Sequence, residues 1–190
     1  PAYTETKTYL VKCILIPAEI RINNSKNPAS AELYDTNTAA NAKSYSVSVY
    51  EQQATVSGFN VEFYTLTENG GNITHNTATL ENVLEYVYLV VNDVLITSKQ
   101  DLESALKTSA INDVQIYGKK QTETTFAISF MATSEYGRWQ EDNKIEYQKR
   151  TISNELRFVV HHGAEKFDVA DDYKQDGRAV LYIERGKTEV

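Results

Sequence analysis

The sequence predicts a mainly β protein, α+β by count, built as an antiparallel β-sandwich or barrel with one short embedded helix near residues 99–109. Runs of alternating or β-branched residues recur, with turn residues between them every ten or so positions. One segment carries a helix-start signal. No stretch has the composition of a linker, so the 190 residues are expected to form a single β-rich domain, 1–190, with a polar loop or arm at 23–42.

The first quarter of the chain contains three predicted strands and this polar segment. Lys7–Ile16 is almost continuously apolar or β-branched, which is typical of a strand covered on both faces, and Pro17 ends it because proline lacks a backbone N–H. Glu19–Ile22 and Ser44–Val49 alternate between apolar and polar residues, so each is expected to bury one face. Between them, Asn23–Ala42 is rich in Asn, Ser, Ala and Thr and predicts a long surface loop.

The next segment contains a hairpin turn and one ambiguous stretch. Phe59–Phe63 alternates as a strand does, and the glycines of Glu68–Asn72 suit a hairpin turn. Leu80–Ile96 fits either an amphipathic helix or two short strands about Asn92-Asp93. We favour the hairpin because Val, Tyr and Ile dominate and Asn-Asp is turn chemistry.

The embedded helix is predicted from its cap. Ser98 can accept hydrogen bonds from the free amides of a helix start, and Asp101 suits the first turn. Leu102, Ala105 and Leu106 would then share one face, and the helix is expected to end near Ser109. Further strands are predicted at Val114–Tyr117, Thr125–Met131, Ile145–Tyr147, Leu156–His162 and Val180–Glu184.

Composition and charge exclude several classes of function. The formal net charge is −7, which repels phosphate backbones, so no nucleic-acid partner is expected. The uncharged apolar runs are too short to insert into a membrane, so the chain is expected to be soluble. Cys13 is the only cysteine, so no intrachain disulfide is possible and an oxidising compartment is not required. Composition leaves the compartment itself open.

The stretch from Phe158 to Tyr173 holds two of the three histidines and raises the question of a metal site. The candidate ligands are His161, His162, Asp168 and Asp172. On a strand, adjacent side chains point to opposite faces, so His161 and His162 are expected to diverge. Structural metal sites need three or more convergent ligands, so the sequence predicts neither a metal nor another cofactor here.

Catalytic motifs are not visible either. The chain has no G-x-S-x-G nucleophile elbow and no Walker or dinucleotide-binding glycine loop. The remaining catalytic hypothesis uses the α-amine of Pro1 as a general base, or the region of His161 and His162. No catalytic residue is predicted, and the sequence favours a non-enzymatic role.

The aromatic composition indicates contact surfaces. There are 13 Tyr against 6 Phe and 1 Trp, and tyrosine is enriched both on exposed faces of sheets and at protein interfaces. The leading hypothesis is a structural subunit that assembles with copies of itself, such as a component of a viral particle, tube or shell. The predicted interface residues are Pro1, Tyr3, Tyr34, Tyr136 and Trp139. The alternative is a binding module that recognises a carbohydrate or protein partner through loops rich in Asn, Thr and Tyr.

Overall fold

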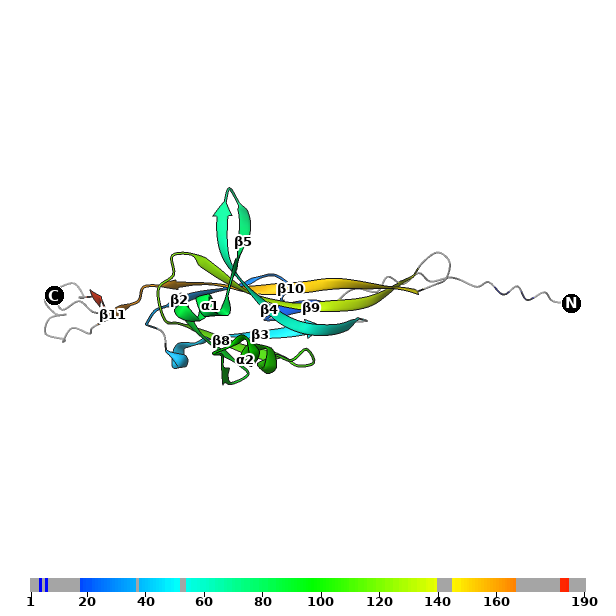
Figure 1. Cartoon of the computed structure of the whole chain (residues 1–190), viewed down its shortest axis with the longest axis horizontal. Helices are drawn as coiled ribbons and strands as arrows, with labels where there is room; N and C mark the ends of the chain where they lie inside the picture. The colour runs from blue at the N-terminus through cyan, green and yellow to red at the C-terminus, as the bar shows by residue number, and fades with distance from the viewer. Residues whose placement is uncertain are drawn as a thin grey trace.

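The computed structural model describes residues 4, 6, 18–36, 38–51, 54–139, 145–166 and 182–184, with the backbone path alone at 138, 139, 145, 164–166 and 182–184. Strands dominate, and two short helices are embedded among them (Figure 1). The elements are β1 (Glu19–Ile22), β2 (Ala29–Tyr34), η1 (Ala39–Asn41), β3 (Lys43–Tyr50), β4 (Thr55–Asn69), β5 (Asn72–Ala78), α1 (Leu80–Tyr86), β6 (Val87–Val91), β7 (Val94–Leu95), α2 (Lys99–Ala105), β8 (Asn112–Gly118), β9 (Thr125–Trp139), β10 (Ile145–His161), β11 (Ala164–Lys166) and β12 (Tyr182–Glu184).

Two five-stranded sheets form a sandwich. The first sheet has the order β1-β3-β8-β6-β7 and is antiparallel throughout. The second has the order β2-β10-β9-β4-β5 and is antiparallel except where β2 runs parallel to β10. Each described sheet is open, with two edge strands, so the predicted β-sandwich is confirmed and the barrel alternative is wrong.

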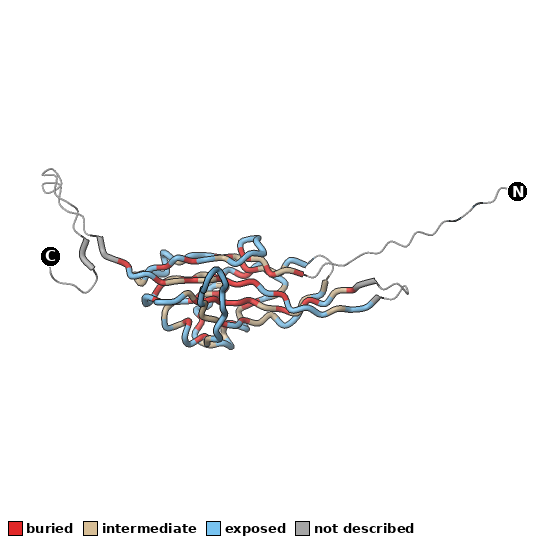
Figure 2. The backbone as a smooth tube through the Cα atoms, turned by 90° about the horizontal axis from the view of Figure 1, so that it is seen from above, coloured by how far each residue is buried: buried red, intermediate tan, exposed pale blue. Residues whose placement is uncertain are grey.

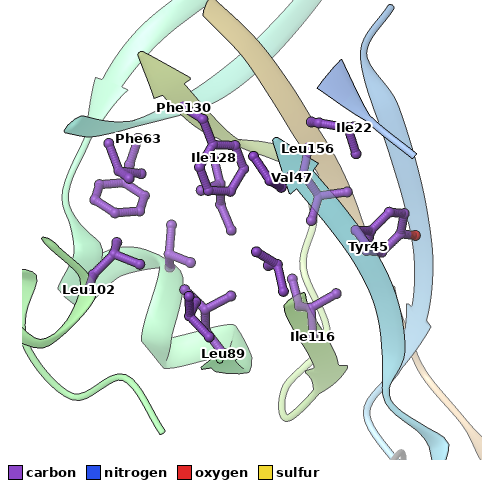
Figure 3. Packing of buried hydrophobic residues seen from close by; sticks show 14 of the residues in the cluster. Ile22, Tyr45, Val47, Phe63, Leu89, Leu102, Ile116, Ile128, Phe130 and Leu156 are labelled. Atoms are coloured by element: carbon purple, nitrogen blue, oxygen red, sulfur yellow. The ribbon is translucent and has the colours of Figure 1, made fainter. Parts of the chain in front are cut away.

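The core lies between the two sheets, as expected for strands that alternate apolar and polar residues. The first sheet contributes the buried side chains of Val47, Leu89 and Ile116, and the second contributes Ile128 and Phe130. Helix α2 closes one side with Leu102, which is fully buried (Figure 3). Burial alternates along the strands that face the core, for example at Leu156, Phe158 and Val160 on β10 (Figure 2).

The ambiguous stretch Leu80–Ile96 contains both of the structures that its pattern allowed. The favoured hairpin is correct from Val87 onward, where β6 and β7 pair about Asn92-Asp93. It is wrong before Val87, because Leu80–Tyr86 is helix α1. The physical reason is a capping box: the Thr79 side chain accepts from the Asn82 N–H, and the Asn82 side chain accepts from the Thr79 N–H. This cap was missed in the sequence.

Helix α2 confirms the predicted embedded helix, although it is shorter than expected and ends at Ala105. The Ser98 side chain accepts a hydrogen bond from the Asp101 N–H, as the sequence suggested. The sequence predicted one helix, whereas the structure has a second helix, α1, of the same length as α2.

The predicted loop at Asn23–Ala42 is wrong over its centre, because Ala29–Tyr34 is strand β2. Ala31 and Leu33 point into the core, while Ser30, Glu32 and Tyr34 point outward. This is the alternation of a half-buried strand, which the high content of small polar residues concealed. The predicted strand at Lys7–Ile16 lies outside the described residues.

The two sheets approach each other closely near β2. The Tyr45 hydroxyl on β3 donates to the Ser30 carbonyl on β2 at 3.1 Å. A Cβ atom on Gly118, at the end of β8, would lie 2.1 Å from the carbonyl oxygen of Tyr34. Only a glycine allows this backbone approach, and it anchors the edge of the second sheet to the first.

Candidate assembly interface

The two adjacent histidines are held by separate carboxylates. His161, the last residue of β10, pairs through Nε2 with Glu32 on β2. His162 places Nδ1 2.9 Å from Asp35 Oδ2, and the Gly163 N–H donates to the other oxygen of Asp35 at 2.7 Å. Within the described part of the chain, no group of three or more His, Cys, Asp and Glu residues is placed to hold a metal ion. Asp168 and Asp172 lie outside that part.

The third histidine has a carboxylate partner as well. His75 on β5 places Nε2 2.9 Å from Glu155 on β10, and Arg157 contacts the other oxygen of Glu155 through Nε at 2.7 Å and Nη2 at 2.6 Å. Because β4 and β9 lie between β5 and β10 in the sheet, the β4–β5 hairpin must bend over the outer face to make this contact. Figure 1 shows the hairpin standing off the sheet. The three histidine–carboxylate pairs connect β10 and the residue after it to β2 or the residue after β2 on one side and to β5 on the other. Their role is therefore structural.

Tyr64 belongs to the same cluster. Its ring meets the His75 ring edge to face, with centroids 5.3 Å apart. The Tyr64 hydroxyl hydrogen-bonds to the Glu62 carboxylate, which raises the pKa of Tyr64, and burial and the Glu155 charge raise it further. A tyrosine with this surrounding stays protonated at neutral pH, so the cluster contains no activated tyrosinate.

The structure separates the predicted interface residues. Tyr34 lies at the end of β2 beside the His161 ring, with its side chain 48% exposed. Tyr136 lies near the far end of β9, opposite Gln148 on β10. The fourteen residues of β10 from Gln148 to His161 span about 43 Å, so the two tyrosines mark opposite ends of the sandwich. Trp139 ends β9, and its side chain lies outside the described part, as do Pro1 and Tyr3.

The end of the molecule at Tyr136 is a two-stranded ribbon that projects beyond the sandwich (Figures 1 and 2). The ladder between β4 and β9 stops at Thr55↔Glu135. The pairs from Tyr136↔Gln148 to Trp139↔Ile145 continue past it with no third strand beside them among the described residues. Tyr147 on this ribbon is 69% exposed. We define Tyr136–Trp139 and Ile145–Gln148 as the ribbon.

Tyr147 was missed by the sequence reasoning, although a signal for it was present. The strand-like segments on both sides of the polar stretch Gln140–Lys144 predict one long hairpin. Each arm of that hairpin carries a tyrosine, Tyr136 on one and Tyr147 on the other. The predicted strand at Ile145–Tyr147 was treated as separate from Leu156–His162, so the length of β10 and the projection of its end could not be seen.

The other edge of β10 is also free along much of its length. Strand β2 covers β10 only from Leu156 to His161. From Tyr147 to Glu155 the β2 side of β10 carries no ladder partner in the part of the chain that the structure describes. An uncovered strand edge presents unpaired N–H and C=O groups and is a ready template for pairing with another strand.

A different aromatic cluster lies on the outer face of the first sheet. The rings of Tyr88 on β6 and Tyr117 on β8 are stacked, with centroids 4.8 Å apart. Lys119 Nζ lies 5.0 Å from the centroid of Tyr88, and Leu95 nearby on β7 is 50% exposed. These residues form an amphipathic surface with a local positive charge.

Comparison with known proteins gives little to identify the chain. No protein-family profile and no curated protein sequence matches it. One solved structure that it resembles belongs to a chaperone–tip adhesin complex described as vital for synergistic activation of CFA/I fimbriae biogenesis, with 12% sequence identity and a TM-score of 0.41. The match covers 78% of this chain and 59% of that one, so this chain spans about three-fifths of the matched chain's length. No described helix is long and apolar enough to cross a membrane.

Proposed function

We propose that the chain is a structural subunit that assembles with copies of itself and that the ribbon of β9 and β10 is part of the contact surface. The observation that carries this proposal is that the ribbon extends past its own sheet, with no third described strand beside it. A two-stranded ribbon alone is marginally stable in water, because it lacks a surface against which to bury its side chains. A neighbouring subunit supplies such a surface.

The side chains of the ribbon suit a protein partner. Tyr147 is mostly exposed, and Tyr136 and Trp139 add aromatic residues to the same end of the molecule. Aromatic residues are enriched at interfaces, and a few of them usually carry most of the binding free energy. The charged groups Glu135 and Lys149 at the base of the ribbon form a loose ion pair, with Nζ and Oε2 3.9 Å apart, so no strong net charge opposes association there.

The proposal is tested by native mass, measured by light scattering over a hundredfold range of concentration. We expect the full chain to form an oligomer. The double substitution Tyr136→Ser and Tyr147→Ser is expected to raise the concentration at which this oligomer dissociates at least tenfold. The matched control is Tyr88→Ser, which removes a tyrosine from the outer face of the other sheet. A monomer at every concentration, or an oligomer that the double substitution leaves unchanged, contradicts the proposal.

A second candidate function, a binding module for a carbohydrate or a protein, is favoured by the cluster of Tyr88, Tyr117 and Lys119. Exposed aromatic rings with a polar group beside them are typical of ligand contacts. A glycan array and a pull-down with the full chain test it: this reading requires a binder that Tyr88→Ser loses and that the Tyr136→Ser and Tyr147→Ser variant retains.

A further inference from the structure

The free edge of β10 faces a hollow between the two sheets. Its volume is about 450 Å³, and it lies where β1 of the first sheet passes the uncovered part of β10. The lining residues are Ala18, Glu19, Ile20, Lys26, Arg150, Thr151, Ile152 and Ser153.

The backbone of β10 points hydrogen-bonding groups into this hollow. In an antiparallel pair, alternate residues direct both backbone groups to the same side. The His161 carbonyl accepts from the Asp35 N–H on the β2 side, whereas Val160 bonds to Thr122 on the β9 side. Odd-numbered residues of β10 therefore face the β2 side, and Thr151 and Ser153 present their N–H and C=O groups to the hollow.

Next to the hollow, the Asn154 side chain takes the place of a strand partner at Glu155. The Asn154 side chain accepts from the Glu155 N–H at 2.8 Å and donates to the carbonyls of Ile20 and Ser25, each at 3.1 Å. Asn154 thus satisfies the edge at Glu155 and ties it to β1 and the following turn. At Thr151 and Ser153, which precede Asn154 on β10, no described side chain takes the place of a strand partner in this way.

One wall of the hollow is apolar, whereas Glu19, Lys26 and Arg150 place charged groups at its rim. Ala18, Ile20 and Ile152 are buried, with exposures of 2%, 2% and 8%, and all three line it. An extended strand placed about 4.8 Å from β10 would pair with Thr151 and Ser153 and would lay apolar side chains against these three residues. The site therefore fits a β-strand with at least one apolar face, added in line with β2.

We propose that this hollow binds residues 7–16 of a second copy of the chain as an added strand, an inference that rests on the proposed self-assembly. In the sequence Lys-Thr-Tyr-Leu-Val-Lys-Cys-Ile-Leu-Ile, one face of a strand would carry Tyr9, Val11, Cys13 and Leu15, which are all apolar or aromatic. This composition is that of a strand that must be covered by other strands. The hollow offers the cover and the free edge together.

The connection of the chain favours a second copy over the same copy. Ala18 follows Pro17 directly and is itself a wall of the hollow, where its N–H donates to Ser134 Oγ at 3.0 Å. Ser134 pairs with Arg150 and Ile20 contacts Asn154, so β1 runs in the same direction as β10. A strand of the same chain could therefore pair with Thr151 and Ser153 only if the backbone reversed within residues 15–17, just before Ala18. That stretch is Leu-Ile-Pro and contains no Gly, Asn or Asp, the residues that tight hairpin turns require.

The single cysteine of the chain provides the test. Arg150→Cys and Ile152→Cys, two lining positions on the same face of β10 as the apolar wall, are made separately in the full chain, which is then exposed to oxidised glutathione. If residues 7–16 of another copy pair with β10, Cys13 reaches a Cα separation of about 4.4–6.8 Å from one of these positions and a disulfide forms between chains. We expect covalent dimers and higher multimers on non-reducing gels, at least tenfold more than with the matched control Ser44→Cys on the outer face of the first sheet.

Three outcomes overturn the inference. The first is multimers that persist when Cys13→Ser is added to Ile152→Cys, because the link then does not involve residue 13. The second is a link within one chain, seen as faster migration without a rise in mass. The third is the absence of any link while light scattering still shows the oligomer, which leaves the proposed function standing. A monomer at all concentrations contradicts the proposed function instead.

A proline substitution on β10 provides a second, independent test of the added strand. Thr151→Pro removes an N–H that faces the hollow and leaves the ladder with β9 intact, as proline is tolerated on edge strands. We expect the variant to keep its circular dichroism spectrum and to lose the oligomer. A folded variant with unchanged native mass contradicts the added strand.

Discussion

Asn92 and Asn112 are hydrogen-bonded to each other, with Asn92 Nδ2 3.0 Å from Asn112 Oδ1. They occupy equivalent positions in the phrases Val91–Val94 and Ile111–Val114, which share Asn-Asp-Val. Asn92 adopts a positive φ of 49° in the β6–β7 turn, and its Oδ1 accepts from the Asp113 N–H at 2.9 Å. The repeated phrase therefore marks one shared network that joins two turns of the first sheet.

Replacing Asn112 by Ala is expected to lower the free energy of unfolding by about 3 kcal/mol. The side chain is fully buried and donates to the carbonyls of Val47 and Lys107, which would lose their partner in the absence of water. Urea denaturation followed by tryptophan fluorescence measures the change. The control is Asn76→Ala, an exposed amide on β5, for which we expect a change within about 0.5 kcal/mol. Equal effects of the two substitutions would contradict the role of the network.

Gly118→Ala is expected to destabilise the sandwich by about 3 kcal/mol or more. The new methyl group would lie 2.1 Å from the Tyr34 carbonyl oxygen, which belongs to a backbone that cannot move without opening the contact between the sheets. Thermal unfolding measures the loss, and Ser44→Ala on an exposed outer face is the control. A melting temperature within 2 °C or so of the parent would show that the edge at β2 is adaptable.

His75→Ala is expected to release the β4–β5 hairpin while changing the global stability by less than about 1 kcal/mol. The pair with Glu155 is the contact that holds β5 over the outer face, and it is partly exposed to solvent. Amide hydrogen exchange should rise selectively in β5 and the adjoining half of β4. Thr74→Ala, one residue away, is the control, and unchanged exchange in β5 after His75→Ala would mean that backbone pairing alone positions the hairpin.

Helix α2 is expected to fray in acid. Hydrogen bonds from the side chains of Thr97 and Ser98 lower the pKa of Asp101. A lowered folded-state pKa means that the contribution to stability is present above the ordinary aspartate pKa and is lost as the pH falls through the folded value. The protection factors of the α2 amides, which correct exchange for its intrinsic pH dependence, should therefore fall in the parent as the pH drops from 6 to 2. Asp101→Asn should flatten this dependence, and an identical pH profile in both proteins would contradict the role of the cap.

Local chemistry predicted the elements that depend on neighbouring residues. The Ser98 cap predicted α2, and the alternation of Tyr45, Val47 and Val49 predicted β3, because both signals act over a few residues. The cap of α1 was equally local, but the β-branched residues that follow it concealed it. Strand β2 was hidden because its pairing with β10 is parallel and its partner is more than a hundred residues away.

An interface rich in aromatic residues stays a prediction, and the sequence did not place those residues in the fold. Tyr34 and Tyr136 were both expected at an interface, yet nothing in the sequence says that they lie beside opposite ends of one long strand, β10. The reach of β10 depends on which strands stop beside it, and where the ladders to β2 and β4 end is a property of three-dimensional packing. The divergence of His161 and His162 could be predicted because a strand fixes the direction of adjacent side chains, while their acidic partners on and just after β2 could not.

Strand β10 also gives the molecule a mechanical axis. Its seventeen residues run from the ribbon at one end to the pairing with β2 at the other, a length of about 53 Å. A pull applied between those two ends acts along the strand, so it loads the ladder with β9 in shear. The hydrogen bonds of that ladder must then fail together, whereas a pull across the strands would open them one at a time. Tension carried along a row of such subunits would therefore meet each molecule in its most resistant direction.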